Sequence, residues 1–159
     1  MKSENNLSPE EINNLVELLK KVRLPAPYPV FLALYKSVTM AVVNLAIMPN
    51  KKSILLTRRK DEFFDNWHLP GSILLTGESP EETAKRVARK ELGIAITDLR
   101  FAHYFHDNTV RGSEVDLLFI AKPKGEPNNG QYFGLDEIPK DLIEFQNKQI
   151  KYLKYGNSI

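Results

Sequence analysis

The stretch from Trp67 to Ile94, WHLPGSILLTGESPEETAKRVARKELGI, constrains the fold of this chain more than any other segment. It joins a glycine-containing loop to a helix whose two ends are marked in the sequence. Ser79 is the expected N-cap, Pro80 the first helical residue, and Glu82 completes a capping box. Gly93 supplies the left-handed residue that commonly ends a helix. The segment therefore predicts a loop followed by a helix of defined length.

Several residues of this stretch match the Nudix hydrolase signature, which the segment resembles. The matching residues are Glu78, Arg86, Glu91, Gly93 and Ile94. Ser72 stands at the opening glycine of the signature, and Val87 and Lys90 stand where two of its glutamates belong. The resemblance therefore covers the residues that shape the loop and the helix better than it covers the acidic residues.

Apolar and β-branched runs predict further elements along the chain. Strands are expected at residues 37–48, 54–57, 98–106, 114–122 and 131–135, and a last helix at residues 139–155. The order β-β-loop-α-β-β-β-α indicates an α+β fold with a mixed β-sheet between helices, and the resemblance implies the same Nudix-type α/β/α sandwich. We expect residues 1–35 to form an N-terminal helix and Pro-rich connector, and residues 36–159 to form the Nudix domain.

An N-terminal helix is predicted over residues 8–22. Ser8 is its N-cap, Pro9 its first residue, and Glu11 closes a capping box. An apolar stripe at helical spacing comprises Ile12, Leu15, Leu19 and Val22. The run LPAPYP at residues 24–29 ends the helix and connects it to the domain. This extension either packs onto the domain or forms part of a homodimer contact.

Composition limits the classes of partner. A formal net charge of +2 gives no basis for general nucleic-acid binding. The chain has no cysteine, which excludes disulfides and thiolate metal sites. The most apolar run, residues 30–48, contains polar residues and falls short of the roughly 20 apolar residues of a membrane span. The polar N-terminal residues do not resemble a secretory signal. We expect a cytoplasmic protein, and the Nudix resemblance implies a small-molecule nucleotide as its substrate.

The architectural half of the motif has clear expected roles. Glu78 and Arg86 are spaced to pair across the junction between the loop and the helix, and the equivalent residues of Nudix proteins are chiefly architectural. Gly71 allows the backbone to turn tightly and leaves its carbonyl free to face a ligand. Gly93 ends the helix and returns the chain to the core.

The chemical half of the motif is reduced. In the full Nudix signature three glutamates on one helix face gather Mg²⁺ ions that bridge a diphosphate. Here the three positions hold Val87, Lys90 and Glu91, so the carboxylate at the last position stands alone. Mg²⁺ is often held by only one or two carboxylates, with water and substrate phosphates completing its coordination. We therefore expect a reduced site for Mg²⁺ or Mn²⁺ made by Glu91 and the Gly71 carbonyl.

One branch of the family, the GDP-mannose mannosyl hydrolases, also lacks the first two of these glutamates. The chain resembles that branch in this respect and in the segment HYFHDNTVRG at residues 103–112. The branch takes a glutamine ligand and a histidine base from a late loop. This chain has GEPNNGQYFGL there, so Glu126, Asn128 or Asn129 would have to serve, and no histidine follows His106.

Basic residues outside the signature are candidates for binding phosphates. Arg58 and Arg59 follow the second predicted strand, where basic residues of related hydrolases meet phosphates, and Arg111 lies in the DNTVRG turn. Each is equally well explained as surface charge. Lys90 either binds phosphate directly at the emptied metal position or extends into solvent.

The candidates for the general base are His106 and Glu78. His106 is expected on the strand face that also carries Tyr104, near the turn. His103 is expected to alternate with Phe101 and Phe105 on the opposite face, which favours a packed histidine over a base.

Together these features favour a Mg²⁺-dependent Nudix-type hydrolase that acts on a nucleoside diphosphate linked to another group, as in a nucleotide or a sugar nucleotide. The alternative is a catalytically silent Nudix fold that binds a nucleotide or a protein partner. Val87 and Lys90 are the residues that support this alternative.

Overall fold

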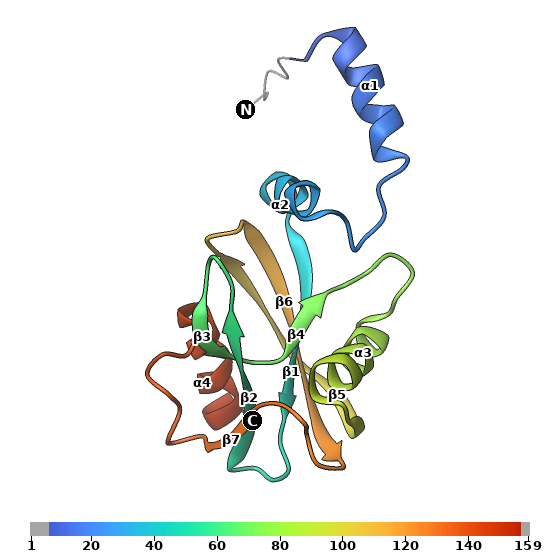
Figure 1. Cartoon of the computed structure of the whole chain (residues 1–159). Coiled ribbons are helices and arrows are strands. Elements are labelled where there is room, and N and C mark those ends of the chain that lie inside the picture. Colours follow the sequence, from blue (N-terminus) through green and yellow to red (C-terminus); the bar gives the residue numbers. More distant parts are fainter. Residues whose placement is uncertain (1–6, 157–159) are drawn as a thin grey trace.

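The larger of two β-sheets is mixed and has the strand order β4-β1-β6-β5 in the computed structural model, which describes residues 7–156 (Figure 1). Its strands are β1 (Met40–Ile47), β4 (Gly71–Ile73), β5 (Ala95–Asn108) and β6 (Ser113–Lys124). β1 runs parallel to β6 and antiparallel to β4, while β5 and β6 form an antiparallel hairpin. The predicted mixed sheet is confirmed.

The smaller sheet is antiparallel and has the order β3-β2-β7. Its strands are β2 (Ser53–Lys60), β3 (Asp65–His68) and β7 (Gln131–Gly134). The sequence did not predict β3 and β4, because both are short and lie within the proline- and glycine-containing motif loop. The chain passes from the smaller sheet to the larger one between these two strands, at residues 69–70. The motif loop is therefore held by both sheets.

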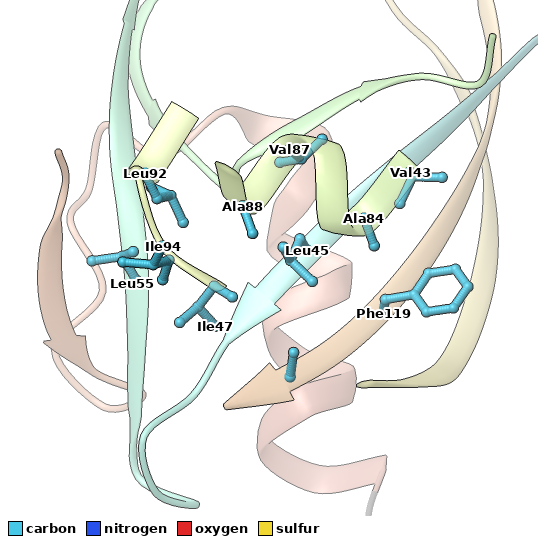
Figure 2. Close-up of a cluster of buried hydrophobic side chains, with 11 residues drawn as sticks. Val43, Leu45, Ile47, Leu55, Ala84, Val87, Ala88, Leu92, Ile94 and Phe119 are labelled. Atoms are coloured by element: carbon cyan, nitrogen blue, oxygen red, sulfur yellow. The ribbon is translucent and has the colours of Figure 1, made fainter. Parts of the chain in front are cut away.

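Helix α3 (Pro80–Leu92) packs against one face of the larger sheet (Figure 2). The side chains that join them form a buried cluster of Val43, Leu45, Ile47, Leu55, Ala84, Val87, Ala88, Leu92, Ile94, Phe119 and Ala121. Alternate residues of β1 contribute to this cluster, as expected when successive side chains of a strand point to opposite faces.

The opposite face of the larger sheet packs with a short 3₁₀ helix, η1 (Glu144–Gln146), and helix α4 (Asn147–Tyr155). A second buried cluster joins α4 to this face and to β2, and includes Ala46, Ile54, Leu56, Leu118, Ile120, Ile150 and Leu153. Helices therefore lie on both sides of the mixed sheet, which confirms the predicted α+β sandwich.

Both predicted ends of α3 are confirmed. The Ser79 hydroxyl accepts a hydrogen bond from the Glu82 N–H at 3.2 Å, and the Glu82 carboxylate accepts one from the Ser79 N–H at 2.7 Å. Gly93 has a φ of 68° and ends the helix in the left-handed conformation. The helix that carries the motif thus begins and ends where its sequence requires.

The prediction of a connector followed by a strand from residue 37 was wrong. Residues Tyr28–Ser37 form a helix, α2, and β1 begins only at Met40. Pro29 lies in the first turn of α2, where a missing N–H costs nothing because first-turn N–H groups have no helical partner. The proline run therefore starts a helix as well as ending one.

The predicted last helix was too long at its N-terminal end. Residues 141–143 are not helical and bond to β3: the Trp67 N–H donates to the Asp141 carbonyl, and the Ile143 N–H donates to the Trp67 carbonyl. These bonds use backbone groups that a helix would need, so α4 begins at Asn147, after η1. The helix face that includes Leu153 does point inward as predicted.

Helix α1 (Pro9–Leu19) has the predicted capping box between Ser8 and Glu11, but it ends earlier than the predicted residue 22. None of its residues is buried, and it stands apart from the sheets, beyond α2 (Figure 1). The interpretation that α1 packs onto the domain was therefore wrong. Within residues 7–156, every helix is too short or too polar to cross a membrane.

Candidate active site

The predicted pair between Glu78 and Arg86 is present and holds the motif loop against α3. The Arg86 guanidinium donates to both Glu78 carboxylate oxygens, at 2.7 and 2.8 Å. It also donates to the Ser72 hydroxyl at 3.1 Å and to the Ile73 carbonyl at 3.0 Å. Ser72, which replaces the opening glycine of the signature, thus adds a hydrogen bond to this junction.

This bonding commits Glu78 to a structural position. The Arg86 guanidinium lowers the pKa of Glu78 to about 2, and the Thr83 hydroxyl adds a further hydrogen bond at 2.8 Å. A carboxylate held in this way stays ionised, and its oxygens are occupied by donors. Of the two candidates for the general base, Glu78 is the one whose oxygens already have partners.

Glu91 lies five residues after Arg86 and has a different environment. Its side chain is half-buried, and the Gly71 N–H acts on its carboxyl group as a donor that lowers its pKa. Burial has the larger effect and raises the pKa of Glu91 to about 7, although the positive charges of Arg59 and Arg86 also act in the opposite direction. Oxygens of a half-buried carboxylate that are not held in an ion pair can accept a cation.

Gly71 connects Glu91 to the two sheets. The Leu45 N–H donates to the Pro70 carbonyl at 2.8 Å and the Leu74 N–H donates to the Ala41 carbonyl at 2.9 Å. Since bonded positions alternate along an antiparallel pair, the Gly71 N–H and carbonyl point away from β1, at the edge of the sheet. A β-carbon on Gly71 would lie 2.5 Å from the Asn44 side-chain oxygen, so only glycine fits here.

The other two glutamate positions of the signature do not face this site as ligands. Val87 is 1% exposed and belongs to the core cluster beneath α3, whereas Lys90 is exposed to solvent. Within residues 7–156, no group of three or more histidine, aspartate or glutamate side chains is placed to hold a metal ion. Glu91 and the Gly71 carbonyl fit a minimal site, in which water and substrate phosphate supply the remaining ligands of Mg²⁺.

A small polar cavity of about 60 Å³ lies beside Gly71. Its walls come from α2, both sheets and η1, and include Tyr35, Asn44, Arg59, His68, Gly71, Arg111, Glu114 and Gln146. His68 is neutral, because burial lowers its pKa to about 4, and its ring bonds the Thr57 hydroxyl at 3.0 Å. The fixed positive charges of the cavity are therefore those of its arginines.

Two of the three predicted phosphate-binding arginines line this cavity. The guanidinium of Arg59 lies 5.1 Å from the Phe64 ring centre, and that of Arg111 lies 5.6 Å from the same ring. Arg58 does not join them, because adjacent strand residues point to opposite faces. It is bound instead by the carboxylates of Asp65 and Asp141. The structure thus brings Arg59 and Arg111 together and places Arg58 elsewhere.

Helix α2 closes the far wall of the cavity. The Tyr35 hydroxyl donates to Glu114 Oε1 at 2.6 Å, and Arg111 donates to the same oxygen at 2.9 Å while its guanidinium lies 4.8 Å from the Tyr35 ring centre. Glu114 is 1% exposed, so its charge depends on these donors. The sequence prediction missed Tyr35, because it assigned no element to residues 28–35, and it gave Glu114 no role beyond its place in a predicted strand.

An open groove of about 990 Å³ adjoins the cavity at Ile143 and Phe145, which line both spaces. In the groove, the ring of Phe64 stands beside that of Phe145. The two ring centres lie 6.4 Å apart. Beyond them the groove is lined by the amide side chains of Asn66, Asn108 and Asn147 and by Lys148 and Lys151. A narrow, arginine-lined cavity thus opens into a wider surface of aromatic, amide and basic side chains.

His106, the other candidate base, is not a lining residue of the cavity. Its neighbour Asp107 pairs in register with Glu114, which lines the cavity, so the His106 side chain projects from the opposite face of the sheet. There it is exposed and bonds the Ser113 hydroxyl at 3.0 Å.

The predicted face of Phe101 was wrong. A β-bulge between Phe101 and His103 changes the alternation of side chains in β5. Phe101 therefore lies opposite Phe119, on the α3 side of the sheet. His103 stacks on Tyr152 of α4, with ring centres 4.8 Å apart, but it remains exposed to solvent, so it packs on the surface and not in the core.

The asparagines of the late loop contact the end of α3. The Asn128 N–H donates to the Leu92 carbonyl at 3.0 Å, and the Asn129 side chain donates to the Glu91 carbonyl at 3.3 Å. These bonds satisfy carbonyls that a helix leaves free at its C-terminus. Glu126 is exposed. The loop thus supports the backbone that carries Glu91.

A buried polar network beneath the cavity was also missed. The Asn44 amide donates to Asp116 at 2.7 Å and to Gln149 at 3.3 Å. Burial raises the pKa of Asp116 to about 8, and the nearby carboxylates of Glu114 and Asp107 act in the same direction. Asn44 interrupts an otherwise apolar strand, and that interruption was the signal in the sequence.

Comparisons with known proteins agree with this architecture. The family described as the NUDIX domain matches residues 38–153. An ADP-ribose pyrophosphatase of Methanocaldococcus jannaschii is 24% identical, over 78% of this chain and 78% of its own length. A MutT NUDIX hydrolase from Burkholderia pseudomallei superposes with a TM-score of 0.64 at 24% identity, covering 72% of this chain and 97% of that one. A MutT/nudix family protein from Enterococcus faecalis gives 0.60 at 19% identity and covers 95% of this chain and 74% of its own.

Proposed function

The chain belongs to the Nudix family and is a Nudix-type hydrolase, and from this premise we propose that its substrate is a nucleoside diphosphate linked to another group, hydrolysed with the aid of Mg²⁺ or Mn²⁺. One observation carries the proposal. Gly71, whose N–H acts on the carboxyl of Glu91, lines the same cavity as Arg59 and Arg111. Two guanidinium groups thus face the backbone that neighbours the Glu91 carboxyl, although Glu91 itself does not line the cavity.

Glu91 and the Gly71 carbonyl would hold the metal. When bound, the ion neutralises phosphate charge and activates water. A single carboxylate suits Mg²⁺ only when the substrate itself supplies ligands, so metal and substrate should bind together. Glu78 and Arg86 keep Gly71 and Glu91 in position by fixing the loop on the helix.

Arg59 and Arg111 would bind the diphosphate. Guanidinium groups bind phosphate oxygens through paired, charge-assisted hydrogen bonds. The buried Nε of Arg111 has no hydrogen-bond partner within residues 7–156, so this guanidinium is not fully bonded by protein groups. His68 adds no charge, because it is neutral at physiological pH.

The groove beyond Phe64 and Phe145 would take the larger part of the substrate. The cavity of about 60 Å³ is too small for a nucleoside, whereas ligand sites commonly have volumes of roughly 300–1,000 Å³. The groove has about 990 Å³ and offers aromatic and amide side chains. The similarity to an ADP-ribose pyrophosphatase makes ADP-ribose the first compound to test.

A silent nucleotide-binding protein is the second candidate. The burial of Val87 in the core and the exposure of Lys90 favour it, because neither position provides a ligand. On this alternative, Arg59 and Arg111 would bind the nucleotide phosphates without metal.

A substrate panel with a matched pair of variants separates the two candidates. ADP-ribose, dinucleotides, sugar nucleotides and nucleoside triphosphates are incubated with the protein and Mg²⁺ or Mn²⁺. Glu91→Gln should reduce kcat by about a hundredfold or more, because a metal supplies several kcal/mol to the transition state. Glu81→Gln, at an exposed position of the same helix, should not change it. Turnover that is unaffected by Glu91→Gln would refute the assigned ligand, and metal-independent nucleotide binding without turnover would establish the silent alternative.

A further inference from the structure

Helix α1 presents an uncovered apolar stripe. Ile12, Leu15, Val16 and Leu19 recur at helical spacing and are 42–46% exposed. Leu18, at the margin of the stripe, is 60% exposed. Scattered apolar residues are normal on protein surfaces, but a continuous stripe on one helix is typical of an interaction surface.

The helix needs a partner for stability. It has 11 residues, and isolated helices shorter than about 12–15 residues are marginal in water. Its capping box and the ion pair between Glu17 and Lys20 each stabilise it only modestly. Most helical stability in proteins comes from burying an apolar face. The domain of the same chain does not bury this face, since α1 stands apart from the sheets (Figure 1).

The sequence of α1 is complementary to itself in the antiparallel direction. A two-fold axis between Leu15 and Val16 places Ile12 opposite Leu19 of a second copy, and Leu15 opposite its Val16. Apolar residues therefore meet apolar residues along the whole stripe. This is the isologous contact that a two-fold symmetric dimer requires, in which one surface pairs with itself.

The charges of α1 favour the same direction. Glu10 and Glu11 lie in its first turn, while Lys20 and Lys21 directly follow its last residue. An antiparallel pair places the acidic end of each helix beside the basic end of the other, whereas a parallel pair would align like charges. The helix dipoles also oppose one another in the antiparallel arrangement.

We propose that the protein self-associates through α1, which pairs antiparallel with α1 of a second copy about an axis between Leu15 and Val16. Two helices of this length bury less than the roughly 1,200 Å² of a standard stable interface, so the dimer is expected to be weak and concentration-dependent. The contact leaves the cavity and the groove open, because α1 contributes no lining residue to either. The proposal is independent of the substrate.

Sedimentation velocity of the full chain over a range of concentrations tests the interface. The wild-type protein should shift from monomer to dimer as concentration rises, and Leu15→Glu should remain monomeric. Asn14→Glu adds the same charge on the opposite side of the helix and should dimerise like the wild type. A wild-type protein that stays monomeric, or a dimer that Leu15→Glu leaves intact, overturns the proposal. An unchanged thermal unfolding midpoint shows that the variant domains are folded.

The orientation is tested by cross-linking, since the chain has no cysteine. Ile12→Cys and Leu19→Cys are made as separate proteins, mixed and oxidised, and the disulfides are identified by mass spectrometry. Antiparallel pairing gives chiefly the mixed 12–19 disulfide. Homodisulfides at 12–12 and 19–19 would show parallel pairing and refute the proposed arrangement.

Discussion

Two glutamates that frame the same helix have opposite environments. Glu78, before the N-terminus of α3, is bonded by Arg86 and Thr83, and the Arg86 guanidinium lowers its pKa to about 2. Glu91, near the C-terminus of α3, is half-buried, and burial raises its pKa to about 7. The first carboxylate is stabilised in its charged form and the second is not.

This contrast assigns different roles to two glutamates of one motif. A carboxylate that already has strong donors gains little from a cation, whereas a partly desolvated carboxylate that forms no ion pair gains more. Groups whose environments shift their pKa values apart often have different roles. Glu78 therefore fixes the loop, and we expect Glu91 to be the carboxylate that binds a cation. The following predictions test this division.

The largest effect is expected at Val87, a buried residue that stands where the signature has a glutamate. Val87→Glu places a carboxylate among apolar side chains and should lower the free energy of unfolding by about 3–4 kcal/mol, measured by urea denaturation. Lys90→Glu introduces the same group at an exposed position and should change stability little. Wild-type stability for Val87→Glu would mean that position 87 can turn toward the cavity, and that the metal site retains its geometry.

Breaking the structural half should cost somewhat less. Arg86→Ala removes the guanidinium that donates hydrogen bonds to Glu78, Ser72 and the Ile73 carbonyl. It should lower the free energy of unfolding by roughly 2–3 kcal/mol. In the double variant Glu78→Ala with Arg86→Ala, the loss of stability should be smaller than the sum of the two single losses. Each single variant leaves one charged group without its partner, whereas the double variant removes both groups. Additive losses in this cycle would show that the two side chains are not coupled.

Glu91 should make the stability of the folded protein depend on pH. Because the pKa of Glu91 is raised in the folded state, that state binds an extra proton between about pH 4.5 and 7, and stability falls as pH rises through this range. Glu91→Gln removes this dependence and should be more stable than the wild type by roughly 2 kcal/mol at pH 8, and equal to it near pH 4. Thermal unfolding in metal-free buffer measures both. A steeper loss of the variant at high pH would contradict the assignment.

The local features of α3 were predictable because they depend on neighbouring residues. Its N-cap, its capping box, its left-handed end and the pairing of Glu78 with Arg86 all follow from spacings within one segment. Val87 is buried because it lies on the face of α3 that packs on the sheet, a consequence that the signature alone does not predict.

The cavity could not be predicted because its walls come from distant parts of the chain. Tyr35 and Glu114 meet across 79 positions. Because a connector was predicted at residues 24–29, the sequence did not predict helix α2, which contributes Tyr35. Arg58 and Arg59 were indistinguishable in sequence, and only the strand register shows which one faces the cavity.

The smallest effect is expected at Lys90, whose side chain either extends into solvent or binds phosphate directly. Its side chain is exposed, so its charge acts on the metal site through solvent and salt. Lys90→Gln should therefore strengthen Mg²⁺ binding in the presence of nucleotide by less than about 1 kcal/mol, measured by calorimetric titration, and high salt should abolish the difference. Lys85→Gln, at an exposed position nearer the start of α3, is the matched control and should have no effect. If Lys90→Gln instead weakens nucleotide binding without metal, the ammonium group itself binds phosphate, and the emptied metal position has acquired a different use.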